Sequence, residues 1–225
     1  STQQETLFPY TTLFRSAADR LLYPQESSGP LFQAEEVKMI RQQTMRALEV
    51  LKAMKEYSKP VRLDLREEAI NPLVSETVRN VQSHFEGSSR PVTFQLRESG
   101  SYLVKVDRTA LDRALHNLLK NAADAYFHPR AKERKPVILV DLQPAAEPSL
   151  IQISIRDHGA GIDPATLGKL REFYPGTHSN KADGTGFGLP NAARLIRELG
   201  GMLKLDSVYG EGTTATVFLP LSTEI

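Results

Sequence analysis

The chain of 225 residues contains no cysteine. It can therefore form neither a disulfide framework nor a thiolate zinc site, and it has no cysteine nucleophile. No stretch approaches the roughly 18 apolar residues that a membrane-spanning helix needs, so we expect no membrane contact within it. The 28 basic and 27 acidic side chains leave a net charge of +1, which gives no electrostatic reason to expect nucleic-acid binding.

The composition is that of an ordinary globular protein. With 40% apolar and 24% charged residues, the chain is not disordered throughout. Its length allows one large domain, or a smaller domain with an appendage. The absence of cysteine fits a reducing compartment, and we expect a cytoplasmic location. A sensor region and any membrane anchor of the parent protein would lie upstream.

Residues 1–16 have neither helical nor strand periodicity, and the run TLFPYTTLFRS looks like translated sequencing-adapter sequence. We interpret these residues as a non-native leader and leave them out of the fold prediction. The alternative is a short native N-terminal strand. Residues 17–59 are predicted to be a helix-like fragment at 17–22, a loop that begins at Pro24, and a long helix, and residues 60–225 show a mixed helix and strand pattern.

The stretch from Ala34 to Tyr57 predicts one long helix, because it contains no glycine or proline. Its apolar side chains recur at alternating spacings of three and four residues, as in a coiled coil. The positions of this seam are Val37, Ile40, Thr44, Ala47, Leu51 and Met54, and Met45 and Leu48 widen it. One helix cannot bury such a seam, so we expect partner helices and a homodimer through helix 34–57. Packing against the chain's own globular domain is the alternative.

Residues 60–225 predict a compact α+β domain. The predicted helices cover residues 69–85, 109–126, 164–172 and a segment that ends at 199. The predicted strands are 92–97 and 102–106, joined by a turn at 98–100, then 136–142 and 150–157, and a terminal hairpin of 202–208 and 213–221. The predicted fold is a two-layer α/β sandwich, a mixed sheet covered by helices on one face and preceded by a long coiled-coil-like helix.

The first of three segments suited to chemistry is RALHNLLKNAADA. Asn117 and Asn121 lie four residues apart and so share one helix face. The intervening Leu118, Leu119 and Ala122 lie on other faces and suit packing. An asparagine carbonyl oxygen is a ligand suited to Mg²⁺, which commonly keeps water and phosphate oxygens as its other ligands. Taken alone, the pair is more simply explained as two solvent-facing amides.

In the second segment, RDHGAGI, Asp157 ends a strand and is followed by Gly159 and Gly161. Without side chains at the glycines, a flat base can lie against the backbone while the Asp157 carboxylate accepts a hydrogen bond from an exocyclic amine. The alternative is a tight turn with a helix cap at Asp163, and we expect that cap to form as well.

In the third segment, DGTGFGLPNAARLIRELGG, Gly184, Gly186 and Gly188 stand immediately before a helix. Backbone amides at glycines, together with the positive end of a helix dipole, form an anion site. The segment is not a Walker A loop, since no Lys-Ser or Lys-Thr pair follows the glycines, and it lacks the spacing of the dinucleotide fingerprint. Alone, it indicates phosphate binding only weakly.

Taken in this order, the three segments resemble the ATPase domain of histidine kinases, a branch of the Bergerat-fold family that also includes gyrase, Hsp90 and MutL. NLLKNAADA resembles the N box, DHGAGI the first glycine box and GTGFGL the second, while LREFYPGTHSNK is similar to a divergent phenylalanine box. The resemblance covers about Val61 to Leu221. SAADRLL and the helix before Pro60 look like part of the dimerisation and phosphotransfer hairpin of nitrogen-regulation-type sensor kinases.

The resemblance implies a catalytic ATP-binding domain at 60–225, with a partial phosphotransfer hairpin at 17–59. It implies that the chain binds ATP and Mg²⁺ and transfers the γ-phosphoryl group to a histidine, for relay to a response regulator. Asn121 would hold Mg²⁺, Asn117 would support the phosphate side, and Asp157 would read the adenine amino group. The implied nucleotide contacts are Asp157, Gly159, Gly161, Ile162, Lys181, Gly184, Thr185, Gly186, Gly188, Leu189 and Thr213.

The sequence departs from this family at the phosphoacceptor, which in the family is a histidine followed by an acidic residue. The five histidines here are followed by Phe85, Asn117, Pro129, Gly159 and Ser179. None fits, so we expect that the acceptor is absent from this chain and that the chain binds ATP without labelling itself. The alternative is a degenerate kinase that has no acceptor.

Two other positions also depart from the family pattern. Asp124 stands where many members carry a phosphate-facing lysine, and Lys120 or Lys181 would then take that role. His158 replaces a residue that is commonly asparagine, and we interpret it as an exposed turn residue.

Two other function classes remain open. A hydrolytic ATPase of the MutL or Hsp90 kind needs a glutamate one turn before the metal-binding asparagine, where this chain has Asn117. An anti-sigma-type serine kinase or a non-catalytic nucleotide-binding module is the other alternative. The long heptad helix favours the sensor-kinase arrangement over both.

Overall fold

The computed structural model describes residues 34–60, 62–87, 89–128, 131, 134–173 and 186–222. The chain divides into two compact units, Ser1–Ala53 and Met54–Ile225. The predictions for residues 1–33 and for 174–185 lie outside the described residues. None of the described helices is long and apolar enough to cross a membrane.

Helix α2 (Ala34–Ser58) is continuous, as its lack of glycine and proline predicts. Several apolar side chains of the predicted seam and its margin are largely exposed. Their exposed fractions are 51% for Val37, 55% for Met45, 45% for Leu48 and 61% for Leu51. The helix is therefore confirmed, and the partner that would cover these side chains stays a prediction.

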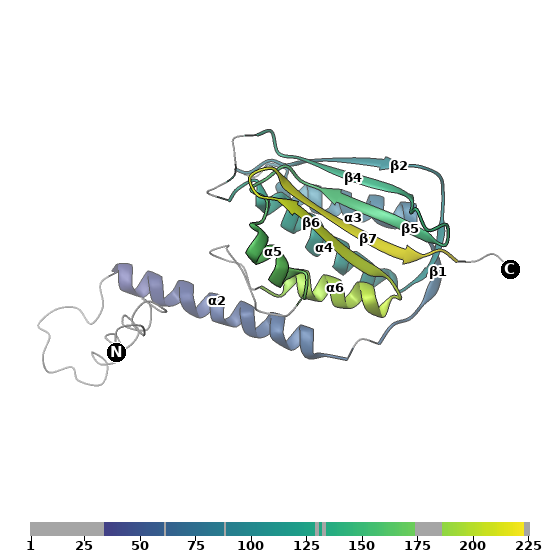
Figure 1. Cartoon of the computed structure of the whole chain (residues 1–225). Coiled ribbons are helices and arrows are strands. Elements are labelled where there is room, and N and C mark those ends of the chain that lie inside the picture. The colour runs from purple at the N-terminus through teal and green to yellow at the C-terminus, as the bar shows by residue number, and fades with distance from the viewer. Residues whose placement is uncertain are drawn as a thin grey trace, which may run out of the picture. The chain divides into compact units, whose positions relative to one another are not determined.

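The second unit is built on a five-stranded mixed sheet with the strand order β2-β4-β5-β7-β6. The strands are β2 (Thr93–Glu98), β4 (Val137–Pro144), β5 (Leu150–Arg156), β7 (Gly212–Pro220) and β6 (Met202–Val208). Only the β2–β4 pair is parallel, and the other three pairs are antiparallel. Helices α3 (Ile70–Phe85), α4 (Arg108–Ala125) and α6 (Gly188–Glu198) cover one face of this sheet (Figure 1). The predicted two-layer sandwich is confirmed.

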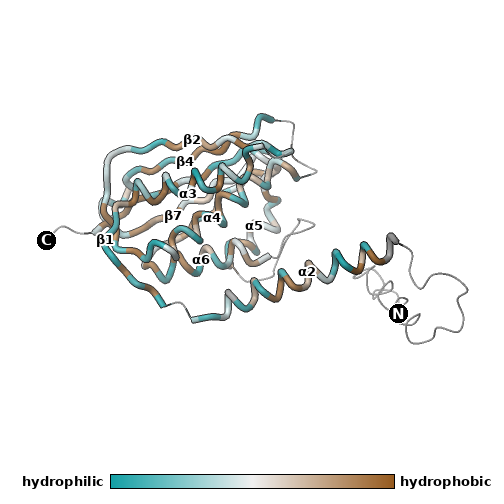
Figure 2. Tube along the Cα trace, turned by 180° about the vertical axis from the view of Figure 1, so that it is seen from behind, coloured by the Kyte–Doolittle hydropathy of each residue, from teal (hydrophilic) through white to brown (hydrophobic). Residues whose placement is uncertain are grey.

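The alternation that predicted strand β5 separates its two faces. Ile151, Ile153 and Ile155 are buried toward the helices, whereas Gln152 and Ser154 on the opposite face are only half-buried. Along the neighbouring strand β4 burial alternates in the same way, although its first four residues are all apolar, and Figure 2 shows how apolar and polar residues are distributed along the elements. Because side chains of successive strand residues point to opposite faces, this pattern fixes which face receives the helices.

A second, two-stranded sheet corrects the prediction of a hairpin at 92–106. Strand β3 (Leu103–Val106) pairs antiparallel with β1 (Arg66–Ala69) and not with β2, which pairs with β4. The Ser99 backbone N–H donates to Leu142 O at 3.0 Å, so the chain leaves β2 still bonded to β4 and does not turn back. Strand β1 was missed because its sequence, REEA, has no alternating apolar signal.

The helices of the second unit are α3 (Ile70–Phe85), α4 (Arg108–Ala125), α5 (Pro164–Leu170) and α6 (Gly188–Glu198). Asp107 caps α4 by accepting a hydrogen bond from the Ala110 N–H at 2.9 Å. Asp163 caps α5 by accepting a hydrogen bond from the Thr166 N–H at 3.0 Å, which confirms the predicted cap. Hydrogen bonding to the Thr166 side chain, and next to its N–H, lowers the pKa of the Asp163 carboxyl.

A histidine pair lies between α3 and α4. The rings of His84 and His116 meet edge to face with their centroids 6.0 Å apart. Burial lowers the pKa of the His116 imidazole. Asp112 opposes this shift, and His84 and Lys120 add to it. Folding therefore favours the neutral form of His116.

This shift predicts a pH dependence of folding stability. The stability associated with neutral His116 is fully present above the unfolded-state pKa of about 6.5. It is lost as the pH falls from there toward the lowered folded-state value. We expect the urea midpoint to drop between pH 7 and pH 5.5 in the parent chain, and to drop less in His116→Gln. Equal drops in the two proteins would contradict this assignment.

Candidate functional site

The predicted asparagine pair faces the beginning of helix α6. Asn117 and Asn121 are half-buried on α4, while Leu118, Leu119 and Ala122 are buried in the core. A Cβ atom placed on Gly188 would lie 3.9 Å from both Asn117 Oδ1 and Asn121 Nδ2. The N-terminal end of α6 and the two asparagines, which are about 70 residues apart in the sequence, therefore form one cluster.

The first turn of α6 favours an anion. Its N-cap residue is Phe187, which provides no side-chain hydrogen bond to the helix, and the first turn carries no acidic residue. Backbone N–H groups at a helix start and the helix dipole attract negative charge. Asn121 beside this turn offers an amide oxygen of the kind that Mg²⁺ accepts together with phosphate oxygens and water.

Asp157 lies directly after strand β5 and is buried, with 5% of its surface exposed. Its Oδ1 accepts hydrogen bonds from the Gly159 N–H at 2.9 Å and the Thr213 N–H at 3.3 Å. Its own N–H donates to Thr213 O at 2.9 Å. The carboxylate is therefore held in one orientation by the loop that follows it and by the first residues of β7.

Helix α4 connects the Asp157 loop to the asparagine cluster. The Ala160 N–H donates to Ala125 O at 3.1 Å, and a Cβ on Gly159 would lie only 2.6 Å from the Ala125 carbonyl carbon and oxygen. Ala125 follows Asn121 by four residues, which places it on the same face of the helix about 6 Å further along the axis. The two clusters thus lie about one helical turn apart.

The glycines of the Asp157 loop permit backbone contacts within the protein. Gly161 has φ +62°, and a Cβ there would lie 2.1 Å from Val208 O, where β6 ends and the β6–β7 turn begins. At Gly159 the space is taken by the end of α4, as described above. The space that the missing side chains leave is therefore filled by the chain's own backbone, and the role of these glycines in lining a base stays a prediction.

Tyr126, which the sequence analysis did not single out, braces the same loop. Its hydroxyl donates to Val137 O on β4 and accepts from the His158 N–H at 2.9 Å. Burial raises the pKa of the Tyr126 phenol, and the Asp157 charge adds to this shift, so the hydroxyl keeps its proton. The His158 side chain is exposed, as predicted. A tyrosine that follows a helix end is too common a pattern to have indicated this role.

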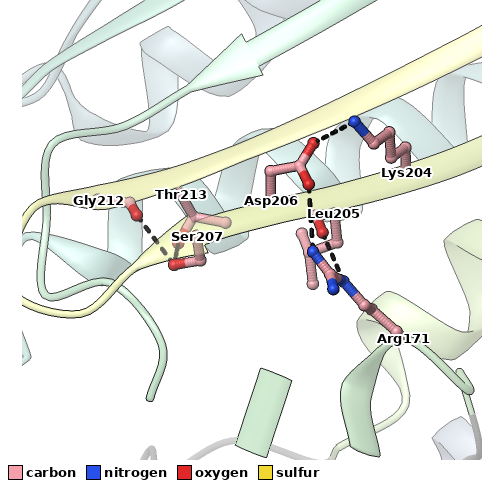
Figure 3. Close-up of polar contacts among 7 residues, drawn as sticks. All are labelled: Arg171, Lys204, Leu205, Asp206, Ser207, Gly212 and Thr213. Carbon is pink, nitrogen blue, oxygen red and sulfur yellow. Dashed lines mark hydrogen bonds and ion pairs between the residues drawn. The ribbon is translucent and has the colours of Figure 1, made fainter. Parts of the chain in front are cut away.

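Ser207 on β6 joins the loop to the first residues of β7. Its hydroxyl lies 2.9 Å from the Ile162 backbone nitrogen, 2.9 Å from Gly212 O and 3.0 Å from Thr213 Oγ1. Figure 3 shows the last two contacts, which cross from one strand of the hairpin to the other. The sequence did not predict a role for Ser207 either, because a serine within a strand does not by itself indicate a structural or functional role.

An adjacent set of polar contacts ties the end of α5 to strand β6 (Figure 3). The Arg171 guanidinium donates to Leu205 O at 3.0 Å and pairs with Asp206 at 3.1 Å. Lys204 also pairs with Asp206, at 2.8 Å. Exposed ion pairs of this kind contribute little to stability. The backbone pairing of β6 with β7 over Met202–Val208 holds the strand that carries Ser207.

Of the remaining predicted nucleotide contacts, some lie within the described residues and others do not. Lys181, Gly184 and Thr185 lie outside the described residues. Gly186 and Leu189 are half-buried at the start of α6. Among the described residues no group of three or more His, Asp or Glu side chains could hold a metal ion by itself. The amide oxygen of Asn121 fits a magnesium ion that takes phosphate oxygens and water as its other ligands.

A cavity of about 180 Å³ lies elsewhere in the second unit. It is lined by the segment before β1, including Lys59 and Arg62, and by residues of α4 and α6, including Arg113, Asn191 and Arg194. None of the predicted nucleotide contacts lines it, so it is separate from the site described above.

Residues 106–223 match the family described as histidine kinase-, DNA gyrase B- and HSP90-like ATPase, which is more than half of the chain. The chain belongs to this ATPase family. Within the family, the signal transduction histidine-protein kinase AtoS of Escherichia coli K12 is 31% identical over 201 residues, which are 88% of this chain and 31% of that protein. The sensor histidine kinase ZraS of Salmonella typhi is 28% identical over 76% of this chain and 35% of its own length. The chain spans about a third of the length of these two relatives.

Solved structures show the same ATPase fold. Full-length ShkA in complex with AMPPNP has a TM-score of 0.65 at 19% identity, covering 95% of this chain and 44% of that chain. The mycobacterial sensor histidine kinase MprB has a TM-score of 0.57 at 22% identity, covering 71% of this chain and 99% of that one. Together with the family match, these comparisons confirm the predicted family and fold. The chain carries the catalytic ATP-binding domain of a sensor histidine kinase.

Proposed function

We propose that the chain binds Mg²⁺-ATP across the two clusters on α4 and transfers the γ-phosphoryl group to a histidine, from which it passes to a response-regulator receiver domain. The observation that carries the proposal is the position of α4. This helix carries the asparagine cluster beside the start of α6 and, one turn further along at Ala125, contacts the loop that follows the buried Asp157. One nucleotide can then be held at its phosphates and at its base.

Each end of the site has its own role. Asp157, beside Thr213, accepts a hydrogen bond from the adenine amino group. The backbone amides at the start of α6, around Gly188, bind phosphate oxygens. Asn121 holds Mg²⁺ against these phosphates, with Asn117 one turn earlier. When bound, Mg²⁺ neutralises charge on the phosphates, which phosphoryl transfer requires more than covalent chemistry by the protein.

The remaining predicted contacts complete the proposal. Gly159, Gly161 and Ile162 line the base, and Gly186 and Leu189 lie at the phosphate end. Lys181, Gly184 and Thr185 are assigned to this site from the sequence motif alone.

The acceptor histidine lies on another polypeptide or on a segment that this chain does not contain, because no histidine here is followed by an acidic residue. The exposed apolar side chains of α2, such as Val37, Met45 and Leu51, support a homodimer through helix 34–57. In a four-helix arrangement of this kind, the helix would pack beside the acceptor helix.

Binding of a non-hydrolysable ATP analogue with and without Mg²⁺ tests the proposal. In the parent chain we expect Mg²⁺ to strengthen binding, as measured by titration calorimetry. In Asn121→Ala we expect binding in the presence of Mg²⁺ to weaken by about tenfold or more, which is about 1.4 kcal/mol. Without Mg²⁺, the parent and Asn121→Ala should bind with nearly the same affinity.

The matched control is Asn80→Ala, an exposed asparagine on α3, which should bind as the parent does. Unchanged Mg²⁺-dependent binding by Asn121→Ala would contradict the proposed metal site. Rapid ATP hydrolysis by the parent chain, abolished by one carboxylate substitution, would instead indicate a hydrolytic ATPase. The position that supplies a glutamate in that class is Asn117 here.

A further inference from the structure

The hydroxyl group of Ser207 contacts three polar atoms from two neighbouring segments of the chain. The Ile162 N–H and Gly212 O each lie 2.9 Å from Ser207 Oγ, and Thr213 Oγ1 lies 3.0 Å from it. A serine hydroxyl has one proton to donate and two lone pairs that accept. Three contacts therefore use its full hydrogen-bonding capacity.

The chemistry of the partners fixes the direction of each hydrogen bond. A carbonyl oxygen only accepts, so the Ser207 proton goes to Gly212 O. A backbone N–H only donates, so Ile162 takes one lone pair of Ser207. The remaining contact is satisfied only when the Thr213 hydroxyl donates its proton to Ser207. The orientation of the Thr213 hydroxyl is thus set by Ser207.

This orientation matters because Thr213 is adjacent to the buried carboxylate of Asp157. The Thr213 N–H donates to Asp157 Oδ1, and the Asp157 N–H donates to Thr213 O. With its proton directed to Ser207, the Thr213 hydroxyl offers only lone pairs to a ligand. The carboxylate also only accepts. A water that donates to both groups would likewise present only lone pairs to the base.

We propose that Ser207 is a positioning residue for purine selectivity: by fixing the Thr213 hydroxyl as an acceptor, it makes the site prefer a 6-amino purine over a 6-oxo purine. This inference rests on the proposed function and deepens it. An exocyclic amine donates to the acceptors beside Asp157, whereas the keto oxygen of inosine or guanosine triphosphate meets their lone pairs. Without Ser207, the Thr213 hydroxyl can rotate and donate to that keto oxygen.

Competition between ATP and inosine triphosphate tests the inference. Inosine carries a keto oxygen in place of the 6-amino group, and its ring atom N1, which only accepts in adenine, carries a hydrogen. The affinities of both nucleotides are measured by calorimetry for the parent chain, Ser207→Ala and Ser207→Thr. We expect the preference for ATP to fall about three- to tenfold in Ser207→Ala, within the range for one hydrogen bond. It should be retained in Ser207→Thr, which keeps a hydroxyl. The ratio of affinities does not depend on the fraction of protein that is folded.

Thr213→Val provides the decisive background, since it removes the hydroxyl that Ser207 orients. In that background, Ser207→Ala should leave the ratio of affinities unchanged. The inference is overturned if Ser207→Ala keeps the parent's preference, or if Ser207→Ala lowers the ratio equally with and without the Thr213 hydroxyl. A parent chain that binds neither nucleotide overturns the proposed function and this inference together. A parent that binds ATP with dependence on Asn121 but not on Ser207 overturns the inference alone.

Discussion

Replacing Asp157 with asparagine is expected to weaken ATP binding by about 100-fold, or about 2.7 kcal/mol. The amide oxygen of asparagine would keep the hydrogen bonds that Oδ1 now accepts from the Gly159 and Thr213 N–H groups. The NH₂ group would then face the adenine amine, so that two donors meet where the parent pairs a donor with a charged acceptor. Loss of a hydrogen bond to a charged group together with the unfavourable contact accounts for this magnitude. Titration calorimetry with Mg²⁺-ATP measures the effect.

The matched control is Asp141→Asn. Asp141 lies on the neighbouring strand β4, one residue from Val140 and Leu142, which point into the core, so its side chain is on the sheet face away from the helices. This substitution changes the net charge by the same amount and should leave ATP affinity within about twofold of the parent. ATP binding by Asp157→Asn at the parent's affinity would mean that Asp157 does not contact the base.

The elements that the sequence predicted well are those in which side chains of one kind recur at a regular spacing. The alternating isoleucines of β5 and the i, i+4 asparagines of α4 each follow from spacing alone, because burial of one face is a local property of a strand or a helix. The helix cap at Asp163 was also predicted correctly, since an aspartate directly before a proline is typical of a helix start and involves only neighbouring residues. The glycine boxes were found by motif.

What sequence analysis missed depends on contacts between residues far apart in the chain. Strand β3 pairs with β1 across more than 30 residues, and the charged sequence of β1 does not indicate a strand. Ser207 contacts Ile162 across 45 residues, and Tyr126 contacts His158 across 32. The spacing of apolar residues within one segment does not indicate which distant segment it contacts. The residues that hold the Asp157 loop in place therefore became visible only in the fold.

The same distinction applies to the glycine boxes, whose positions were predicted but whose packing was not. The sequence suggested that the glycines after Asp157 leave room for a base. In the structure, a Cβ at Gly161 would meet the β6–β7 turn, and a Cβ at Gly159 would meet the end of α4. The loop that carries Asp157 is therefore fixed between two other segments, which is what keeps a buried carboxylate in a constant position.

Gly161→Ala is accordingly expected to destabilise the fold by about 3 kcal/mol. The backbone of Gly161 has φ +62°, which disfavours any L side chain. The added Cβ would also lie 2.1 Å from Val208 O and 3.1 Å from the Gly210 nitrogen, and both are backbone atoms that cannot rotate away. Thermal unfolding should show a fall in Tm of about 6–12 °C for a unit of this size.

Gly168→Ala is the matched control, because it makes the same chemical change where neither cause applies. Gly168 lies within helix α5, and a Cβ there would have no atom within 4 Å. Since alanine is the better helix former, this variant should unfold at or slightly above the parent's temperature. Equal Tm values for Gly161→Ala and Gly168→Ala would mean that the Asp157 loop can move away from the β6–β7 turn at little cost. The rigid placement of Asp157, on which its selectivity for the base depends, would then be wrong.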